Sequence, residues 1–196
     1  MPMAHAQRGF SIEAGLLYDH PNNNTHDRPF PEMQPGYGYI ANLGYDIIDR
    51  IGLEIGVMHT THDYNLFKLG DEILEDNAEK TTFFIKARGI PWKKGKFEVV
   101  TALGAGFFDI SGNSIRKSYS LKISEDFSGW GAIANLNLRY HVTGGLAATF
   151  YLGANFVDYN KYTLFGYPYR YVGKMPGGDS INWGITIFHR IGNPQI

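Results

Sequence analysis

The sequence predicts an all-β protein, an eight-stranded antiparallel up-and-down transmembrane β-barrel with short periplasmic turns and four long extracellular loops. Apolar residues alternate with polar or small residues at a period of two in eight segments, which is the pattern of strands with two different faces. The connectors between these segments alternate between long and short, as in a barrel that carries loops at one end and tight turns at the other. Aromatic residues gather near the segment ends, where membrane barrels place their interfacial girdles.

The eight predicted strands span residues 10–18, 36–47, 50–60, 80–89, 96–108, 128–140, 145–157 and 180–190. Most are close to the ~9–11 residues that a tilted strand needs to cross a bilayer. In the third strand the apolar face consists of Ile51, Leu53, Ile55 and Val57. In the sixth it consists of Trp130, Ala132, Ala134, Leu136 and Leu138, and in the seventh of Leu146, Ala148, Phe150, Leu152, Ala154 and Phe156. A soluble barrel shows the same alternation with its apolar face inward, so the connectors and the aromatic residues decide for a membrane.

Asp, Gly and Pro residues mark three short connectors, at residues 48–50, 89–95 and 141–145, as hairpin turns. The other four connectors, residues 19–35, 61–79, 109–127 and 158–179, are too long for hairpin turns in a compact soluble domain. We expect the turns on the periplasmic side and the long connectors on the extracellular side. An even number of strands then places both termini at the end that carries the turns.

The composition fits one membrane barrel. The chain of 196 residues is 43% hydrophobic and 15% aromatic, yet its mean hydropathy is −0.25 and it has no apolar run long enough for a transmembrane helix. A net charge of −1 gives no electrostatic case for nucleic-acid binding, and the absence of cysteine excludes disulfides and thiolate metal sites. We expect residues 1–7, with Ala4-His5-Ala6, to be a signal-peptide remnant or a disordered N-terminus, residues 8–190 to form the single barrel domain, and residues 191–196 to be a C-terminal tail.

The last predicted strand carries alternate apolar residues at Trp183, Ile185 and Ile187. Together with the strand and connector pattern, it makes the chain resemble the small eight-stranded bacterial outer-membrane barrels, the class of the OmpA transmembrane domain, OmpX, OmpW, NspA and the lipid A deacylase PagL. The resemblance implies a location in the bacterial outer membrane and a last strand that acts as the C-terminal insertion signal. That family usually ends on an outward aromatic residue, whereas Phe188 has inward parity here. Either a bulge shifts the parity or the insertion signal is weak.

Charges of both signs fall at inward positions of this narrow barrel, at Glu13, Glu54, Lys86, Arg88, Glu98 and Arg139. An eight-stranded barrel has room for little besides its own side chains, and buried charges must be paired, so we interpret these residues as a structural network that plugs the lumen. We expect Lys86 and Arg88 to pair with Glu13 and Glu54 and to keep both carboxylates ionised, which argues against acid–base catalysis. The alternative is a gated polar conduit lined by the same side chains.

The sequence predicts no catalytic residue, no metal site and no cofactor. The late connector, with Tyr159-Asn160-Lys161 and residues 176–181, resembles that of the PagL-type lipid A deacylases. The His-x-Ser-Asn signature of that family is missing, because residues 157–160 read Val-Asp-Tyr-Asn, so we expect this chain not to be an enzyme. A second alternative function is a PagL-like lipid A-modifying protein that has lost its activity. His59 and His62 are of the ligand type, but residues i and i+3 of a strand point to opposite faces, which argues against a metal site.

The fourth long connector interleaves tyrosines with cationic residues, at Tyr162, Tyr167, Tyr169, Arg170, Tyr171 and Lys174. Tyrosine and arginine dominate binding hot spots, so we expect a structural or binding role through the extracellular loops, amid outer-membrane lipid, with lipopolysaccharide or a protein as partner. Membership of a larger envelope assembly is compatible with this role. A β-hairpin extension of the last two strands would explain the same aromatic residues by packing. The main alternative function, implied by the resemblance to OmpW, is a small conduit for apolar molecules.

Overall fold

The fold, seen in a computed structural model that describes residues 9–22, 32–65, 76–116, 121–168 and 178–191, consists of antiparallel strands. These are β1 (Gly9–Pro21), β2 (Glu32–Ile48), β3 (Ile51–Asn65), β4 (Asp76–Lys94), β5 (Phe97–Arg116), β6 (Leu121–Thr143), β7 (Leu146–Leu164), β8 (Tyr167–Pro168) and β9 (Ser180–Ile191). Each long strand pairs with the next, and β9 pairs with both β7 and β1. The eight long strands therefore close into a ring, and the two-residue β8 only extends β7.

The outer surface of this ring is apolar. Alternate residues of each strand point outward, and Leu16, Leu103 and Ile185 are 74%, 65% and 66% exposed. The inward positions hold most of the buried polar and charged side chains instead. A soluble barrel would invert this arrangement, so the wall is built to face lipid, and the eight-stranded transmembrane barrel predicted from the sequence is confirmed. Within the described residues no helix is long and apolar enough to cross a membrane.

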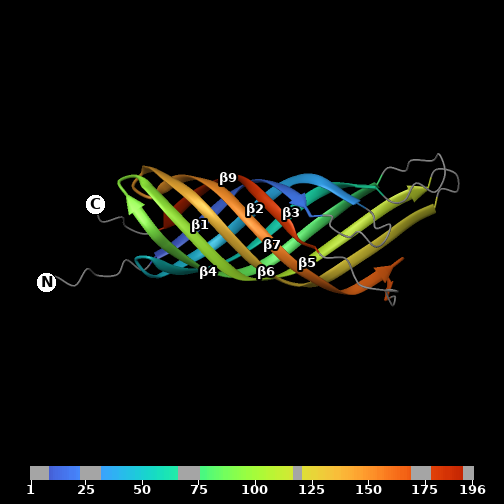
Figure 1. The fold of residues 1–196 in the computed structure, drawn as a ribbon. Helices are drawn as coiled ribbons and strands as arrows, with labels where there is room; N and C mark the ends of the chain where they lie inside the picture. The colour runs from blue at the N-terminus through green and yellow to red at the C-terminus, as the bar shows by residue number, and fades with distance from the viewer. Residues whose placement is uncertain (1–8, 23–31, 66–75, 117–120, 169–177, 192–196) are drawn as a thin grey trace.

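Aromatic side chains form cross-strand pairs at two levels of the outer wall. Near the turns, the ring centroids of Phe10 and Tyr45 are 5.0 Å apart, as are those of Phe97 and Tyr140. Toward the other end, Tyr18 contacts both Tyr37 and Trp183, at 5.1 and 5.2 Å, and Phe107 contacts Trp130 at 5.5 Å. These two levels mark the interfaces of the membrane, and β1 begins and β9 ends at the level near the turns (Figure 1).

Two connectors differ from the sequence prediction. The turn expected at residues 89–95 is confined to Gly95 and Lys96, because β4 passes through Pro91 by means of a register shift between Gly89 and Trp92. A shift of this kind is where a strand accepts a proline, since no ladder hydrogen bond is required there. Far from the turns, β5 and β6 stay paired out to Arg116 and Leu121, so most of the connector expected at residues 109–127 is a two-stranded ribbon.

The ribbon forms because apolar and polar residues continue to alternate beyond the membrane, but here the apolar residues point inward and the polar residues point outward. Ile110 and Phe127 are directly opposite each other, and both are buried on the inward side. Their neighbours Asp109 and Ser128 are polar and take the outward positions. A strand with one apolar and one polar face stays paired in water as well as in lipid.

We expect the protein to require detergent for extraction and to migrate differently on gels before and after boiling, because a closed barrel offers no sheet edge from which to unzip. Electrophoresis of boiled and unboiled samples in SDS checks this. A protein that stayed in solution without detergent would contradict the membrane assignment and favour a soluble lipocalin-like barrel.

Candidate functional site

The lumen near the turns holds a first group of ion pairs around Arg88. Its guanidinium contacts Asp46, lies 3.2 Å from Glu54 Oε1 and donates to the Ser11 hydroxyl at 3.3 Å. Lys86 Nζ is 3.4 Å from the other oxygen of Glu54. All of these side chains are buried, so both cations and both carboxylates depend on each other for the interactions that water would otherwise supply.

A second group surrounds Arg139, whose side chain is fully buried. Its guanidinium lies 3.1 Å from Glu13 Oε2 and 3.8 Å from Glu98 Oε2, and Thr186 donates a hydrogen bond to the other oxygen of Glu13. Glu98 is also 2.7 Å from Lys93 and 3.0 Å from His141, which reach it from the turn end. The two groups share one section of the lumen, and their buried side chains occupy it.

The structure brings together all six charged residues that the sequence placed in the lumen, and Glu54 pairs with Lys86 and Arg88 as expected. Glu13 pairs with Arg139, across the barrel, and not with Lys86 or Arg88 as expected. The sequence analysis missed Asp46, Lys93 and His141, although Asp46 has the same parity as Asn42 on β2. Parity along β2 was thus a signal for Asp46. Nothing in the sequence reports which strand lies opposite which across the lumen.

Phe188 has inward parity because it is part of this network. The Arg139 guanidinium carbon lies 3.6 Å from the centre of its ring, and that of Arg88 lies 5.8 Å away. β9 pairs with β1 and β7 without a register shift, so no bulge turns Phe188 around. An aromatic face next to two buried guanidinium groups supplies cation–π attraction where water is excluded.

Apolar side chains fill the next section of the lumen, farther from the turns. They include Leu17, Ile40, Met58, Phe84, Phe108, Ile133 and Tyr151. This cluster continues along the inside of the ribbon through Ile110, Phe127, Val157 and Tyr159. The inside of the barrel is therefore charged near the turns and largely apolar in its outer half.

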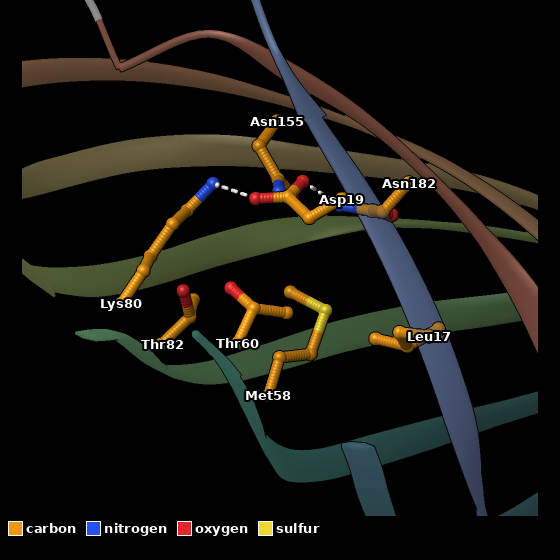
Figure 2. A pocket seen from close by; sticks show the side chains of 8 residues that line it. All are labelled: Leu17, Asp19, Met58, Thr60, Lys80, Thr82, Asn155 and Asn182. Carbon is orange, nitrogen blue, oxygen red and sulfur yellow. Dashed lines mark hydrogen bonds and ion pairs between the residues drawn. The ribbon is translucent and has the colours of Figure 1, made fainter. Parts of the chain in front are cut away.

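One polar cluster interrupts the apolar section. Lys80 Nζ donates to Asp19 and to Ser180, both at 2.8 Å, and His62 Nε2 is 3.5 Å from the same Asp19 oxygen. Figure 2 shows the Lys80 ammonium group directed at the Asp19 carboxylate beside a cavity of about 10 Å³, room for roughly one water molecule. The sequence analysis missed this cluster, because Asp19 was placed in a connector and Lys80 at the first residue of a strand.

No hydrogen bond joins Ser180 to a histidine among the described residues. Its hydroxyl oxygen accepts hydrogen bonds from Lys80 and from Asn155, the latter at 3.1 Å. His59 and His62 point to opposite faces of β3, the first to Thr81 on the outside and the second into the lumen. No group of potential metal ligands occurs among the residues that the structure describes.

β7 and β8 form a two-residue hairpin at the outer end, with Phe165 and Gly166 in the turn. Both residues have positive φ, 53° and 77°, as in a type I′ turn, whose twist matches that of the two strands it joins. Tyr167, next to the turn, is 74% exposed and Phe165 is 48% exposed. Tyr162 lies lower, where its ring centroid is 4.9 Å from that of Phe127 and its hydroxyl donates to Glu125. Tyr169, Arg170, Tyr171 and Lys174 lie outside the described residues.

Comparison with known proteins matches this geometry to a structural class. No family model and no curated protein matches the sequence. Among solved structures, OprG from Pseudomonas aeruginosa superposes with a TM-score of 0.67 at 14% identity, over 96% of this chain and 98% of its own. A major outer membrane protein from Thermus thermophilus gives 0.67 at 13% identity, over 94% of this chain and 100% of its own. The chain has the fold of the small outer-membrane β-barrels.

Ail of Yersinia pestis shares that fold as well. The structure of Ail in complex with the heparin analogue sucrose octasulfate gives a TM-score of 0.56 at 10% identity, over 93% of this chain and 99% of its own. At such identities the likeness defines the fold and leaves the activity open. Together with the lipid-facing wall, it shows that the chain has the architecture of an outer-membrane barrel.

We expect Arg139→Ala to destabilise the barrel by about 3–5 kcal/mol, because Glu13 would stay buried without a cation. Urea unfolding in lipid vesicles, followed by tryptophan fluorescence, measures this. Lys161→Ala, at an exposed position on β7, is the control and should change stability by less than about 0.5 kcal/mol. Equal stabilities of the two variants would contradict the importance of the pair.

We also expect little steady conductance from the unmodified protein in planar bilayers, because paired side chains fill the lumen near the turns. Single-channel recording checks this, with a wide porin as positive control. A large and stable open state would show that the network does not close the barrel.

Proposed function

We propose that this protein is a closed outer-membrane barrel that recognises a protein partner through the tip of its β7–β8 hairpin, defined as Phe165, Gly166 and Tyr167. The observation that carries the proposal is the exposure of two aromatic residues at the tip of a hairpin beyond the membrane, Phe165 in its two-residue turn and Tyr167 next to that turn. The filled lumen supports it indirectly, because it leaves the outer end as the accessible surface.

The backbone at Phe165 supports a role beyond folding. A bulky residue with φ of 53° is strained, and Asn or Gly would fit that position at lower cost. Strain of this kind persists where the side chain is needed for another reason. An aromatic ring held on a tight turn loses little conformational entropy on binding, which is a property of hot-spot residues.

The charge of the outer end of the barrel indicates the class of partner that it favours. Asp63, Glu79 and Asp158 are exposed there, and Asp109 and Asp126 are half-buried. Lys161 is the exposed cation on the same part of β7. Such a surface favours a neutral or basic protein over lipopolysaccharide phosphates, and it differs in chemistry from what a polyanion such as sucrose octasulfate requires. Arg170 and Lys174, which would favour phosphates, lie outside the described residues.

A conduit for apolar molecules is the second candidate, and the apolar outer half of the lumen favours it. Ile40, Met58 and Ile133 would line its path. The ion pairs near the turns oppose it, since a molecule that passed straight through would have to separate buried charges. Faster uptake of an apolar dye by vesicles containing the barrel, relative to empty vesicles, would favour this candidate.

We expect the double variant Phe165→Asn and Tyr167→Ser to reduce partner retention on the order of ten-fold or more, with the barrel still folded. Asn accepts the left-handed backbone, so the turn should form as before. The measurement is the amount of protein crosslinked, in native membranes, to a photoreactive residue placed at Lys161. Asn160→Ser, an exposed polar change on the same strand, is the matched control and should leave crosslinking unchanged.

Unchanged crosslinking in the double variant would contradict the assignment to the hairpin tip. The same conclusion would follow if shortening the other long connectors abolished retention while the tip variant did not. Loss of lipopolysaccharide in place of a protein band would show that the partner class is wrong.

A further inference from the structure

The β4–β5 hairpin lies at the end of the barrel where β1 begins and β9 ends (Figure 1). Ile90 keeps the inward parity of Arg88 and is buried, and the register shift in β4 then directs Trp92 outward, where it is 45% exposed. Beyond this shift Lys93 is directly opposite Glu98, and Lys94 is directly opposite Phe97. The shift therefore decides which lysine faces which side.

The lysines of the hairpin are divided between two environments. Lys93 faces inward, where its Nζ is 2.7 Å from Glu98. Lys94 shares the outward face with Phe97, because directly opposite residues of antiparallel strands point to the same side. Lys96, in the turn, has its Nζ 5.9 Å from the centre of the Tyr140 ring. Neither Lys94 nor Lys96 forms an ion pair with any residue in the described part of the chain.

These outward residues form one surface, the hairpin patch, which consists of Trp92, Lys94, Lys96, Phe97 and Tyr140. The aromatic members are 40–46% exposed, and Phe97 packs against Tyr140. The neighbouring β2–β3 turn adds a further cation, the exposed Arg50. Its backbone carbonyl accepts a hydrogen bond from the Ile90 N–H at 2.9 Å, which holds the two turns together.

The position of this patch sets the depth at which it meets the membrane. Exposed tryptophan and tyrosine mark the level of the lipid headgroups. Lysine stems lie along apolar surface while their ammonium groups stay in the polar layer, at the level of the phosphates. The patch itself contains no acid, and the exposed Asp49 of the β2–β3 turn is outnumbered by the exposed Arg50, Lys94 and Lys96, so the described residues of this interface are cationic on balance.

We infer that the hairpin patch binds the phosphate of an anionic phospholipid in the periplasmic leaflet. Lys94 and Lys96 attract the phosphate, and Trp92, Phe97 and Tyr140 contact the glycerol region and the upper acyl chains. Basic residues close to an anionic membrane surface are attracted to it individually, and two lysines beside three aromatic rings concentrate that attraction at one point of the wall.

The test uses the full-length barrel, extracted in a mild detergent and equilibrated with equal amounts of phosphatidylglycerol and phosphatidylethanolamine. Native mass spectrometry then counts the lipids that each variant retains. Lys94→Gln with Lys96→Gln should lower retained phosphatidylglycerol on the order of ten-fold. Lys94→Arg with Lys96→Arg, which preserves the charge, should retain it as the unmodified protein does. Lys161→Gln, at the opposite end, should have no effect.

Three results would overturn the inference. The first is equal retention of phosphatidylglycerol by the Gln variant and the unmodified protein. The second is an equal loss in the Arg variant, which would mean that charge does not hold the lipid. The third is a preference of the unmodified protein for phosphatidylethanolamine. Migration of unboiled samples shows that each variant is folded, and crosslinking from a photoreactive residue at position 161 should be the same in the Gln pair and the Arg pair as in the otherwise unmodified barrel.

Discussion

The pairing of the first strand with the last is the constraint on which the rest of this barrel depends. β1 and β9 are bonded from Phe10 to Pro21, so the membrane-spanning wall has no open edge. Closure at eight strands also fixes a narrow lumen that side chains must fill. Because inward and outward residues alternate, every strand supplies both the lipid-facing surface and the interior. A change in the register of one strand therefore alters both surfaces at once.

The charges in the lumen make that register specific. Arg88 on β4 contacts carboxylates on β2 and β3, and Arg139 on β6 contacts carboxylates on β1 and β5. A slip of one residue in any of these strands would turn a charge toward lipid and an apolar side chain inward. Buried ion pairs add little stability compared with apolar packing, but breaking one is costly. Their effect here is to exclude alternative pairings.

The sequence was sufficient for the architecture because a period of two is directly visible in it. The inward positions of Glu54, Lys86 and Arg139 follow from parity alone. The ends of the strands were harder to predict from the sequence, because strands that leave the membrane lose their apolar outer face. Pro91 was therefore interpreted as part of a turn, and Asp19 as part of a connector. Partners across the lumen depend on the stagger of the whole barrel, so the contact between Glu13 and Arg139 could not be predicted from local pattern.

The inward Phe188 has a consequence for assembly. It belongs to β9, the strand that closes the ring, and the same strand supplies Thr186 to Glu13 and Arg190 to Asp46. Before β9 is in place, the carboxylates and guanidinium groups of the earlier strands face an open seam, where lipid would meet uncompensated charge. The free energy of an incomplete barrel therefore rises with the amount of charge that it exposes to lipid. The polar interior thus makes insertion more cooperative and disfavours intermediates that lack the final strand.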